Sequence, residues 1–436
     1  MNQFRALKYP PQLFWEVTPL CNHNCVHCFN YWRTDDDKTI KMHQSSNLVD
    51  YMRMVEEIIV LNPVSVVITG GEPFVVWDKI KPCIELLRKN QITVSINTNA
   101  SLVTDEIASF INFFNIPLFV SFPCSDEKIC DEIISIPGSW KKINKGLQLL
   151  VRNNSRFKCN MVVSTKNISY VEDTVAFLKE NYNIKNISIS RVGKPINASN
   201  IFDNYLLDYN DIRRLIELCI KLKNKYHLSI DASAPYPTCS LETQEEYDYF
   251  AGKRLCSAGK TTYVLENDGS VKACPRDSKI YGNIFNEAFD VIWDRMIEWR
   301  DGSLCPNECF ECKQLYECHG GCRVDVLGMD GHCNGLDSAA RVDKLPLSFQ
   351  KCPIEPFIYK DDTKFKVSDQ MISVKENVGY RIAVNGMSTY VSDEAFDFLS
   401  SHAYFTVSDL INVLQVETTI WLIIQSLSQL GIIEEL

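Results

Sequence analysis

Three cysteines lie close together near the start of the chain, in the run Cys21-Asn-His-Asn-Cys25-Val-His-Cys28. Thiolates at this spacing can bind three irons of a [4Fe–4S] cube and leave the fourth iron without a protein ligand. Zinc is the alternative metal, because His23, His27 or another cysteine could complete a tetrahedral site. The three cysteines alone do not separate the two metals, so the neighbouring motifs have to decide.

A second motif, Thr69-Gly70-Gly71-Glu72-Pro73, follows the next predicted strand. Two adjacent glycines let a ligand approach the backbone closely, and the Glu72 carboxylate can accept hydrogen bonds from an ammonium group. The carboxyl ends of barrel strands are where enzymes of this architecture build their sites. Later predicted strands also end in polar residues, namely Asn97-Thr98-Asn99, Ser121, Ser164 and Ser190-Arg191.

The elements that would carry these residues alternate between strand and helix over residues 1–230. Alternation of this kind predicts a parallel sheet, and six units predict a partial (β/α)6 barrel in an α/β fold. The predicted strands are Leu13–Thr18, Val64–Thr69, Ile92–Asn97, Leu118–Phe122, Cys159–Ser164 and Ile187–Ser190. Helical periodicity predicts helices near 47–61, 76–89, 103–114, 139–152, 170–181 and 209–225.

The Cys-x3-Cys-x2-Cys loop after strand one, with Gly-Gly-Glu-Pro after strand two, resembles the radical S-adenosylmethionine (SAM) superfamily. The resemblance covers the first half of the chain and implies a [4Fe–4S] cluster whose open iron is chelated by the methionine moiety of SAM. Cleavage of the bound cofactor would give a 5′-deoxyadenosyl radical that abstracts hydrogen from a substrate. An external electron donor of the flavodoxin or ferredoxin type would reduce the cluster.

The same resemblance assigns roles to individual residues. Cys21, Cys25 and Cys28 would hold the cluster and make the site catalytic. Ser164 and Arg191 would contact the ribose or the carboxylate of SAM. The rest of the predicted cofactor site consists of Gly70, Gly71 and Glu72, which would hold the amino group, together with Pro73 and Asn97.

Composition and charge indicate in which compartment, and with which classes of partner, this chemistry would occur. No apolar run approaches the roughly 18–20 residues that span a bilayer, and the N-terminus has no apolar signal core, so we expect a cytoplasmic protein without a membrane partner. The net charge of −10 argues against a nucleic-acid partner. In a reducing compartment, the 18 cysteines predict metal sites or catalysis rather than disulfides. Seven cysteines outside the clusters are scattered, and most of them read as small buried hydrophobic residues.

Residues 231–358 have few periodic segments and many cysteines, so metal sites would substitute for a missing core. The spacing there resembles the SPASM extension of radical SAM enzymes, which carries two auxiliary [4Fe–4S] clusters. Disulfides or zinc ribbons are the alternatives. The resemblance implies one cluster on Cys256, Cys274 and Cys322, and a second on Cys309, Cys312 and Cys318.

Each auxiliary cluster lacks an obvious fourth ligand. In the family pattern the last cysteine of the second cluster would fall near Ala340, so we expect Cys333 in that role, with Cys352 as the alternative. For the first cluster, the fourth ligand would be Cys305 or Cys239, or one iron would have no protein ligand. Asp277 resembles an acidic residue that acts as a base in one branch of the family, but a surface turn is the reading that we prefer for it.

Residues 359–436 contain no cysteine and read as strands over 372–391 followed by helices near 393–400, 407–415 and 418–430. This order predicts a small winged-helix-like α+β domain. It resembles the PqqD-like recognition element, which binds the leader of a ribosomally made precursor peptide by adding a strand to a sheet edge.

The whole chain therefore resembles SPASM-type maturases that crosslink ribosomal peptides. The run 22–33 resembles those that form carbon–carbon or ether links at aromatic residues, and a thioether is a further product. One alternative is a maturase of a folded protein, such as the formylglycine-forming sulfatase activators. Others are a peptide epimerase, or a zinc-stabilised peptide-binding scaffold without enzymatic activity.

Overall fold

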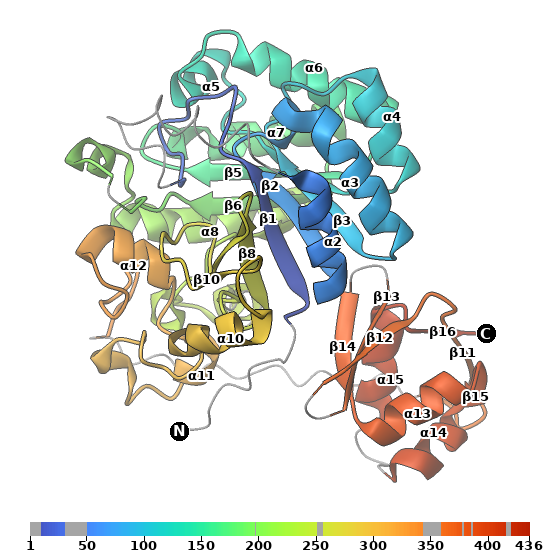
Figure 1. The fold of residues 1–436 in the computed structure, drawn as a ribbon. Helices are drawn as coiled ribbons and strands as arrows, with labels where there is room; N and C mark the ends of the chain where they lie inside the picture. Colours follow the sequence, from blue (N-terminus) through green and yellow to red (C-terminus); the bar gives the residue numbers. More distant parts are fainter. Residues whose placement is uncertain are drawn as a thin grey trace.

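The structure is a computed structural model, shown in Figure 1. The expectation for Cys352 and the tips of the predicted helices 47–61 and 418–430 fall outside the described residues. The described residues are 10–30, 50–196, 198–250, 256–342, 359–376, 379–384, 387–415 and 420–436.

A parallel sheet forms the wall of the barrel. All six predicted strands are confirmed to within two residues at either end, and a seventh, β7 (Ser229–Asp231), continues the sheet. Most of the strands consist largely of buried apolar residues, as expected where both faces of a parallel sheet are covered. In order they are β1 (Gln12–Thr18), β2 (Ser65–Gly70), β3 (Thr93–Thr98), β4 (Leu118–Ser121), β5 (Phe157–Val163) and β6 (Asn186–Arg191).

Helices connect these strands and lie on the outside of the curved sheet (Figure 1). Several begin at a side-chain cap, such as Thr104, which accepts a hydrogen bond from the Ile107 backbone. The unpredicted helix α5 (Glu127–Ile134) has only eight residues, which is too short for a clear periodic signal. The predicted helices are α2 (Tyr51–Leu61), α3 (Trp77–Lys89), α4 (Asp105–Phe113), α6 (Ser139–Arg152), α7 (Val171–Tyr182) and α8 (Tyr209–Tyr226).

The cysteine-rich region extends the same sheet on its other side. Strand β8 (Thr262–Glu266) runs parallel to β1, with Gln12 opposite Thr262, and is followed by the antiparallel β9 (Ser270–Lys272) and β10 (Gly282–Asn283). The remaining segments are short: η5 (Thr238–Ser240), α9 (Gln244–Phe250), α10 (Phe289–Asp294), η6 (Arg295–Trp299), η7 (Asn307–Cys309), α11 (Leu315–Cys318) and α12 (Arg323–Asp330).

Residues 359–436 form a body with its own buried core, which includes Phe365 and Phe398 (orange to red in Figure 1). The expected order of strands before helices is present, and three additional short strands form a second sheet. The first sheet joins β12 (Ile372–Lys375), β13 (Tyr380–Val384) and β14 (Met387–Val391), and the second joins β15 (Tyr404–Thr406), β11 (Lys364–Val367) and β16 (Ile433–Glu435). The helices are α13 (Asp393–Ser401), α14 (Val407–Leu414) and α15 (Ile420–Gln429).

Among the described residues, no helix combines the length and apolar character that crossing a bilayer requires.

Candidate active site

The diglycine turn and the first cysteine loop are hydrogen-bonded to each other. The backbone N–H of Gly71 donates to the carbonyl of Thr18 at 2.6 Å, and that of Glu72 donates to the carbonyl of Leu20 at 2.7 Å. On the far side of the loop, the Asn30 side-chain amide donates to the carbonyl of Gly70 at 3.2 Å. The turn therefore contacts the chain both just before Cys21 and just after Cys28.

Only glycine fits at this contact. A Cβ atom on Gly71 would lie 2.0 Å from the carbonyl oxygen of Leu20, and one on Gly70 would lie 2.4 Å from that of Thr18. Gly70 also has a φ angle of +123°, which side-chain-bearing residues rarely adopt. The two glycines let the backbone of the turn touch the backbone that leads into the cysteine loop.

The cysteine loop also rests on the unpredicted helix α5. The backbone N–H groups of Asn24 and Val26 donate to the carbonyls of Ile134 and Ile133 at 3.1 and 2.9 Å. Within the loop, the Cys28 N–H donates to the Cys25 carbonyl at 3.1 Å, and the three cysteines are all half-buried. The loop is thus held by helix α5 on one side and by the diglycine turn on the other.

Glu72 is fully enclosed at the ends of strands β2 and β3. One carboxylate oxygen accepts hydrogen bonds from the Thr98 hydroxyl at 2.8 Å and the Phe74 backbone at 3.1 Å, and the other accepts from the Asn99 backbone at 2.7 Å. Burial raises the pKa of Glu72 to about 7, although these donors act to lower it. A carboxylate offers about four acceptor positions, so these three donors leave about one position unfilled.

Amide side chains link the end of strand β3 to the cysteine loop. Asn99 donates to the Asn22 side-chain oxygen at 2.9 Å, and the Asn22 amide donates to the Ser101 hydroxyl at 2.8 Å. The predicted Asn97 lies beside this link, where its amide donates to the Thr69 hydroxyl at 3.4 Å. Pro73 is buried and begins the 3-10 helix η2 (Pro73–Val76).

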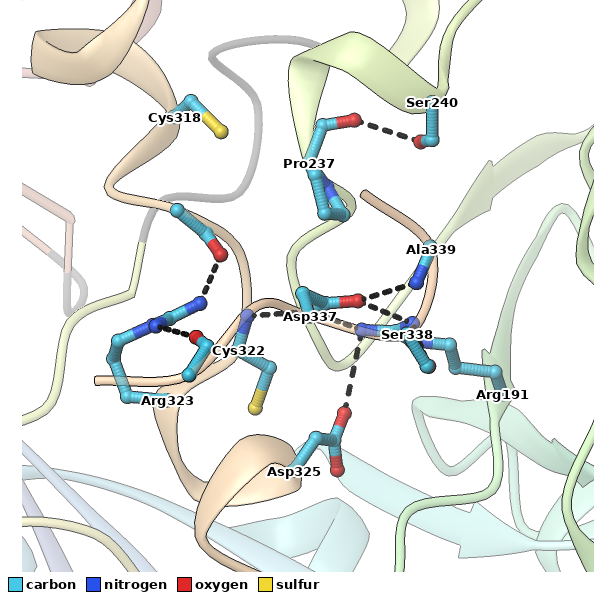
Figure 2. A network of polar contacts seen from close by, with 12 residues as sticks. Arg191, Pro237, Ser240, Cys318, Cys322, Arg323, Asp325, Asp337, Ser338 and Ala339 are labelled. Carbon is cyan, nitrogen blue, oxygen red and sulfur yellow. Dashed lines mark hydrogen bonds and ion pairs between the residues drawn. The ribbon is translucent and has the colours of Figure 1, made fainter. Parts of the chain in front are cut away.

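Ser164 and Arg191, the predicted contacts to SAM, are occupied by protein groups. Ser164 is buried and its hydroxyl lies 3.3 Å from the side-chain oxygen of Asn167. The Arg191 guanidinium donates to both carboxylate oxygens of Asp337, at 2.8 and 2.6 Å, and lies 3.4 Å from an oxygen of Asp325 (Figure 2). Arg191 thus joins the end of strand β6 to the cysteine-rich region, a contact that the sequence did not predict.

Asp337 is the centre of this junction (Figure 2). Besides the two bonds from Arg191, its carboxylate accepts hydrogen bonds from the backbone N–H groups of Cys322 and Ala339, both at 2.9 Å. Its side chain is completely buried. The single carboxylate therefore fixes a predicted cluster ligand, Cys322, relative to the barrel.

The three cysteines assigned to the first auxiliary cluster lie near one another. Burial raises the pKa of Cys322, and the charges of Asp325, Cys256 and Cys274 raise it further. Arg276 is directed toward the Cys322 sulfur at 3.8 Å, which offsets part of this effect. These neighbours are the three residues that the resemblance assigns to one cluster, although their side chains are not close enough to surround a single metal ion.

The second set of cysteines also lies together. Burial raises the pKa of Cys309 to about 12, and Cys318, Cys239 and Cys312 are the thiols that contribute to the shift. Cys305 also lies close to this set: its sulfur is 3.8 Å from the carbonyl of His319, the residue after Cys318, and the Cys318 charge raises its pKa. No three His, Cys, Asp or Glu side chains of the described residues are close enough to surround a single metal ion.

The surroundings of Cys333 contain charged residues. The pKa of Cys333 is raised to about 11 by burial and then by the Asp277 charge, and Arg323, Glu298 and Lys279 make smaller contributions. Asp277 itself is only 3% exposed, so the surface position that we expected is wrong. The Asp277 carboxylate accepts a hydrogen bond from the Lys279 backbone at 3.1 Å. Burial raises the pKa of Asp277, although this hydrogen bond acts to lower it.

Comparison with known proteins agrees with this geometry. The family model described as the radical SAM superfamily matches residues 15–178, which contain both the cysteine loop and the diglycine turn. The radical SAM cyclopropyl synthase TigE of Paramaledivibacter caminithermalis is 24% identical over 349 residues, which cover 74% of this chain and 70% of TigE.

Two further relatives have similar coverage. The mycofactocin maturase MftC of Mycolicibacterium smegmatis is 24% identical over 340 residues, covering 74% of this chain and 80% of MftC. The solved structure of Streptococcus suis SuiB bound to the precursor peptide SuiA has a similar fold, with a TM-score of 0.58, 20% identity and 77% of each chain covered. Residues 15–178 therefore match the radical SAM superfamily, and 74% of the chain is similar in sequence to the radical SAM enzyme TigE and to the maturase MftC.

Proposed function

We propose that this enzyme abstracts hydrogen from a ribosomally synthesised precursor peptide and installs an intramolecular crosslink, with carbon–carbon or ether links at aromatic residues favoured and thioethers a further product. The observation that carries the proposal is the hydrogen bonding of the diglycine turn to both ends of the cysteine loop. This contact would set a SAM amino group beside a cluster with one open iron.

Three thiolates and one carboxylate would hold the cofactors. Cys21, Cys25 and Cys28 would bind the [4Fe–4S] cluster, and Glu72 has an acceptor position left for the SAM ammonium. When bound, the pair would supply the 5′-deoxyadenosyl radical that removes hydrogen from the peptide. The turn fits this role because the absence of side chains at Gly70 and Gly71 lets it pack directly against the backbone that leads into the cysteine loop.

Crosslinking removes two hydrogens from the peptide. One leaves as an atom to the cofactor radical, and the other leaves as a proton together with one electron. An auxiliary cluster in the cysteine-rich region is suited to take that electron, because Cys256, Cys274 and Cys322 lie together there. The Arg191–Asp337 ion pair ties this region to the barrel wall.

The C-terminal body offers a place for a peptide leader. Strands β12 and β14 are the outer strands of their sheet within the described residues, and an extended peptide can add to such an edge through backbone hydrogen bonds. On β14, Met387 and Tyr390 are 46% and 43% exposed and could contact peptide side chains. That the relative SuiB is solved with a precursor peptide supports this class of substrate.

The first test needs no peptide. The anaerobically reconstituted enzyme, given SAM and a chemical reductant, should release 5′-deoxyadenosine, and the triple variant Cys21→Ala/Cys25→Ala/Cys28→Ala should release none. Cys219→Ala is the control, because this buried cysteine lies on helix α8, away from the predicted clusters. A protein that contains zinc without iron and sulfide would contradict the proposal.

The second test uses the short open reading frame nearest to the gene as the substrate source. Its peptide, co-expressed with the enzyme, should lose two hydrogens per crosslink in the mass spectrum. A core peptide without its leader should stay unmodified until the leader is supplied. An unchanged mass combined with incorporation of deuterium from the solvent would instead indicate an epimerase.

A maturase of a folded protein is the second candidate, and the burial of Asp277 favours it. A buried carboxyl group with a raised pKa, beside the predicted cluster ligand Cys274, has the properties of a general base. Under this alternative, Asp277→Asn should stop product formation while 5′-deoxyadenosine is still released. Under the crosslinking proposal, the same variant should leave the two-hydrogen loss in place.

A further inference from the structure

Cys239 differs from the other scattered cysteines. The expectation that they are small buried hydrophobic residues holds for those within the barrel, whereas Cys239 is half-buried and lies in the short helix η5 that follows strand β7. The buried ones are Cys83, Cys124, Cys130, Cys159 and Cys219. Cys239 therefore needs a separate explanation.

One hydrogen bond joins the residue before Cys239 to the second set of cysteines, and another holds the Cys239 sulfur itself. The backbone N–H of Thr238, the residue before it, donates to the sulfur of Cys318 at 3.3 Å. The backbone N–H of Arg341 donates to the sulfur of Cys239 at 3.2 Å. Figure 2 shows the Cys318 side chain beside the turn that begins at Pro237.

The second of these bonds identifies the place that the Cys239 sulfur fills. Arg341 follows Ala340, the position near which the family pattern would have its last cysteine. Ala340 is held there because its N–H donates to the carbonyl of Asp337 at 2.8 Å. The thiol of Cys239 thus lies, although it comes from a distant part of the sequence, against the backbone of the residue that follows position 340.

The electrostatic neighbours agree with this placement. Burial raises the pKa of Cys239, and the charges of Cys318 and Cys312 raise it further, while the Arg341 N–H lowers it. For Cys333, in contrast, the neighbours that shift its pKa are an aspartate, an arginine, a glutamate and a lysine.

The loop that carries Cys239 is firmly held. The carbonyl of Ser240 accepts a hydrogen bond from Arg213 at 2.8 Å, and Arg213 forms a bidentate ion pair with Glu246 at 2.9 and 2.7 Å. On the other side, a Cβ atom on Gly321 would lie 2.9 Å from the ring of Pro237, so the turn packs directly against the chain between Cys318 and Cys322.

We infer that Cys239 supplies the fourth thiolate for the group formed by Cys309, Cys312 and Cys318, in place of a cysteine near position 340. This inference rests on the proposed function, because it presumes that the group binds an iron–sulfur cluster. With four thiolates the second auxiliary cluster has no open iron, so it transfers electrons and does not bind substrate. Among the two auxiliary clusters, an open iron then belongs to the first set, to which Cys239 does not contribute.

The test isolates the auxiliary clusters by using a parent in which Cys21, Cys25 and Cys28 are all alanine. We expect Cys239→Ala in this parent to lower iron and acid-labile sulfide, to about half if one of two clusters is lost. If the cluster survives with three irons instead, an electron paramagnetic resonance signal of a three-iron cluster appears in the oxidised protein. Cys333→Ala is the matched control and should leave both measurements unchanged.

A relocation variant separates ligand loss from misfolding. Adding Ala340→Cys to the Cys239→Ala chain should restore iron, sulfide and the parent spectrum, because position 340 adjoins the site of the lost sulfur. Two results would overturn the inference and leave the proposed function standing. One is an unchanged iron content in Cys239→Ala. The other is loss of iron in Cys333→Ala together with no recovery of iron when Ala340→Cys is added to Cys239→Ala. A parent chain that binds no iron or sulfide overturns both.

Discussion

Replacing Gly71 with alanine tests the central contact of the proposed site. The new Cβ would lie 2.0 Å from the Leu20 carbonyl oxygen, whereas ordinary contacts begin at 3.4 Å, so the turn and the cysteine loop must separate by about 1.4 Å. Movement on that scale breaks the hydrogen bonds from Gly71 to Thr18 and from Glu72 to Leu20.

The energetic consequence follows from those two bonds. Each contributes about 1 kcal/mol, and leaving the buried groups unpaired adds to the loss, so the free energy of unfolding should fall by about 2–4 kcal/mol. Displacement of the loop should also weaken SAM binding at least tenfold, since about 1.4 kcal/mol corresponds to a factor of ten. Chemical denaturation measures the first quantity, and calorimetry on the reconstituted enzyme measures the second.

Gly138→Ala is the control for loss of a glycine as such. Gly138 has a φ of +76°, and a Cβ atom added there would have no heavy atom within 4 Å, so its substitution costs only the left-handed conformation, about 1 kcal/mol. SAM affinity should not change in this variant. If Gly71→Ala unfolds no more easily than Gly138→Ala and binds SAM like the parent, the reasoning about this contact is wrong.

Three further predictions concern other parts of the chain. Arg191→Met leaves Asp337 as a buried carboxylate without its arginine, so the free energy of unfolding should fall by about 3–5 kcal/mol, and a double-mutant cycle with Asp337→Asn should show strong coupling between the two residues. The pKa of Glu72 is about 7 in the folded protein, against 4.5 ordinarily, so the folded state binds more protons than the unfolded state between these pH values. The free energy of unfolding should therefore fall by up to about 3 kcal/mol as the pH rises from 4.5 to 7. Denaturation at several pH values should show this slope in the parent and not in Glu72→Gln. Phe365→Ala opens a cavity in the core of the C-terminal body, so the free energy of unfolding of that body should fall by about 3–5 kcal/mol in chemical denaturation. Phe113→Ala is the control, because Phe113 is exposed, and its stability should stay near that of the parent. Release of 5′-deoxyadenosine should continue in Phe365→Ala.

The sequence predicted the barrel well because its signals are local. The run Val64–Thr69 is largely apolar, and two glycines follow it. The sequence therefore predicts both the strand and the position at its carboxyl end where the site residues begin. The same holds for the first cysteine loop, whose spacing lies within one short segment. Even so, the reason for Gly71 is a contact with Leu20, and the sequence alone does not reveal that contact.

Long-range pairing explains what could not be predicted from the sequence. From the sequence, Arg191 is predicted to be a cofactor ligand at the end of a strand. In the structure it binds the carboxylate of Asp337, which lies 146 residues later in the chain. Cys239 has no cysteine close to it in the sequence, and Asp277 follows a cysteine in a turn that looks exposed until other segments cover it. Each of these partners is fixed by the three-dimensional fold rather than by neighbouring residues.

The pairing of β1 with β8 has a consequence for how the protein is made. Strand β1, Gln12–Thr18, acquires its second neighbour only when Thr262–Glu266 has been synthesised. Contacts between such distant segments slow folding, and an unpaired strand edge favours aggregation during that interval. Nascent chains should therefore depend on chaperones until more than half of the polypeptide has emerged.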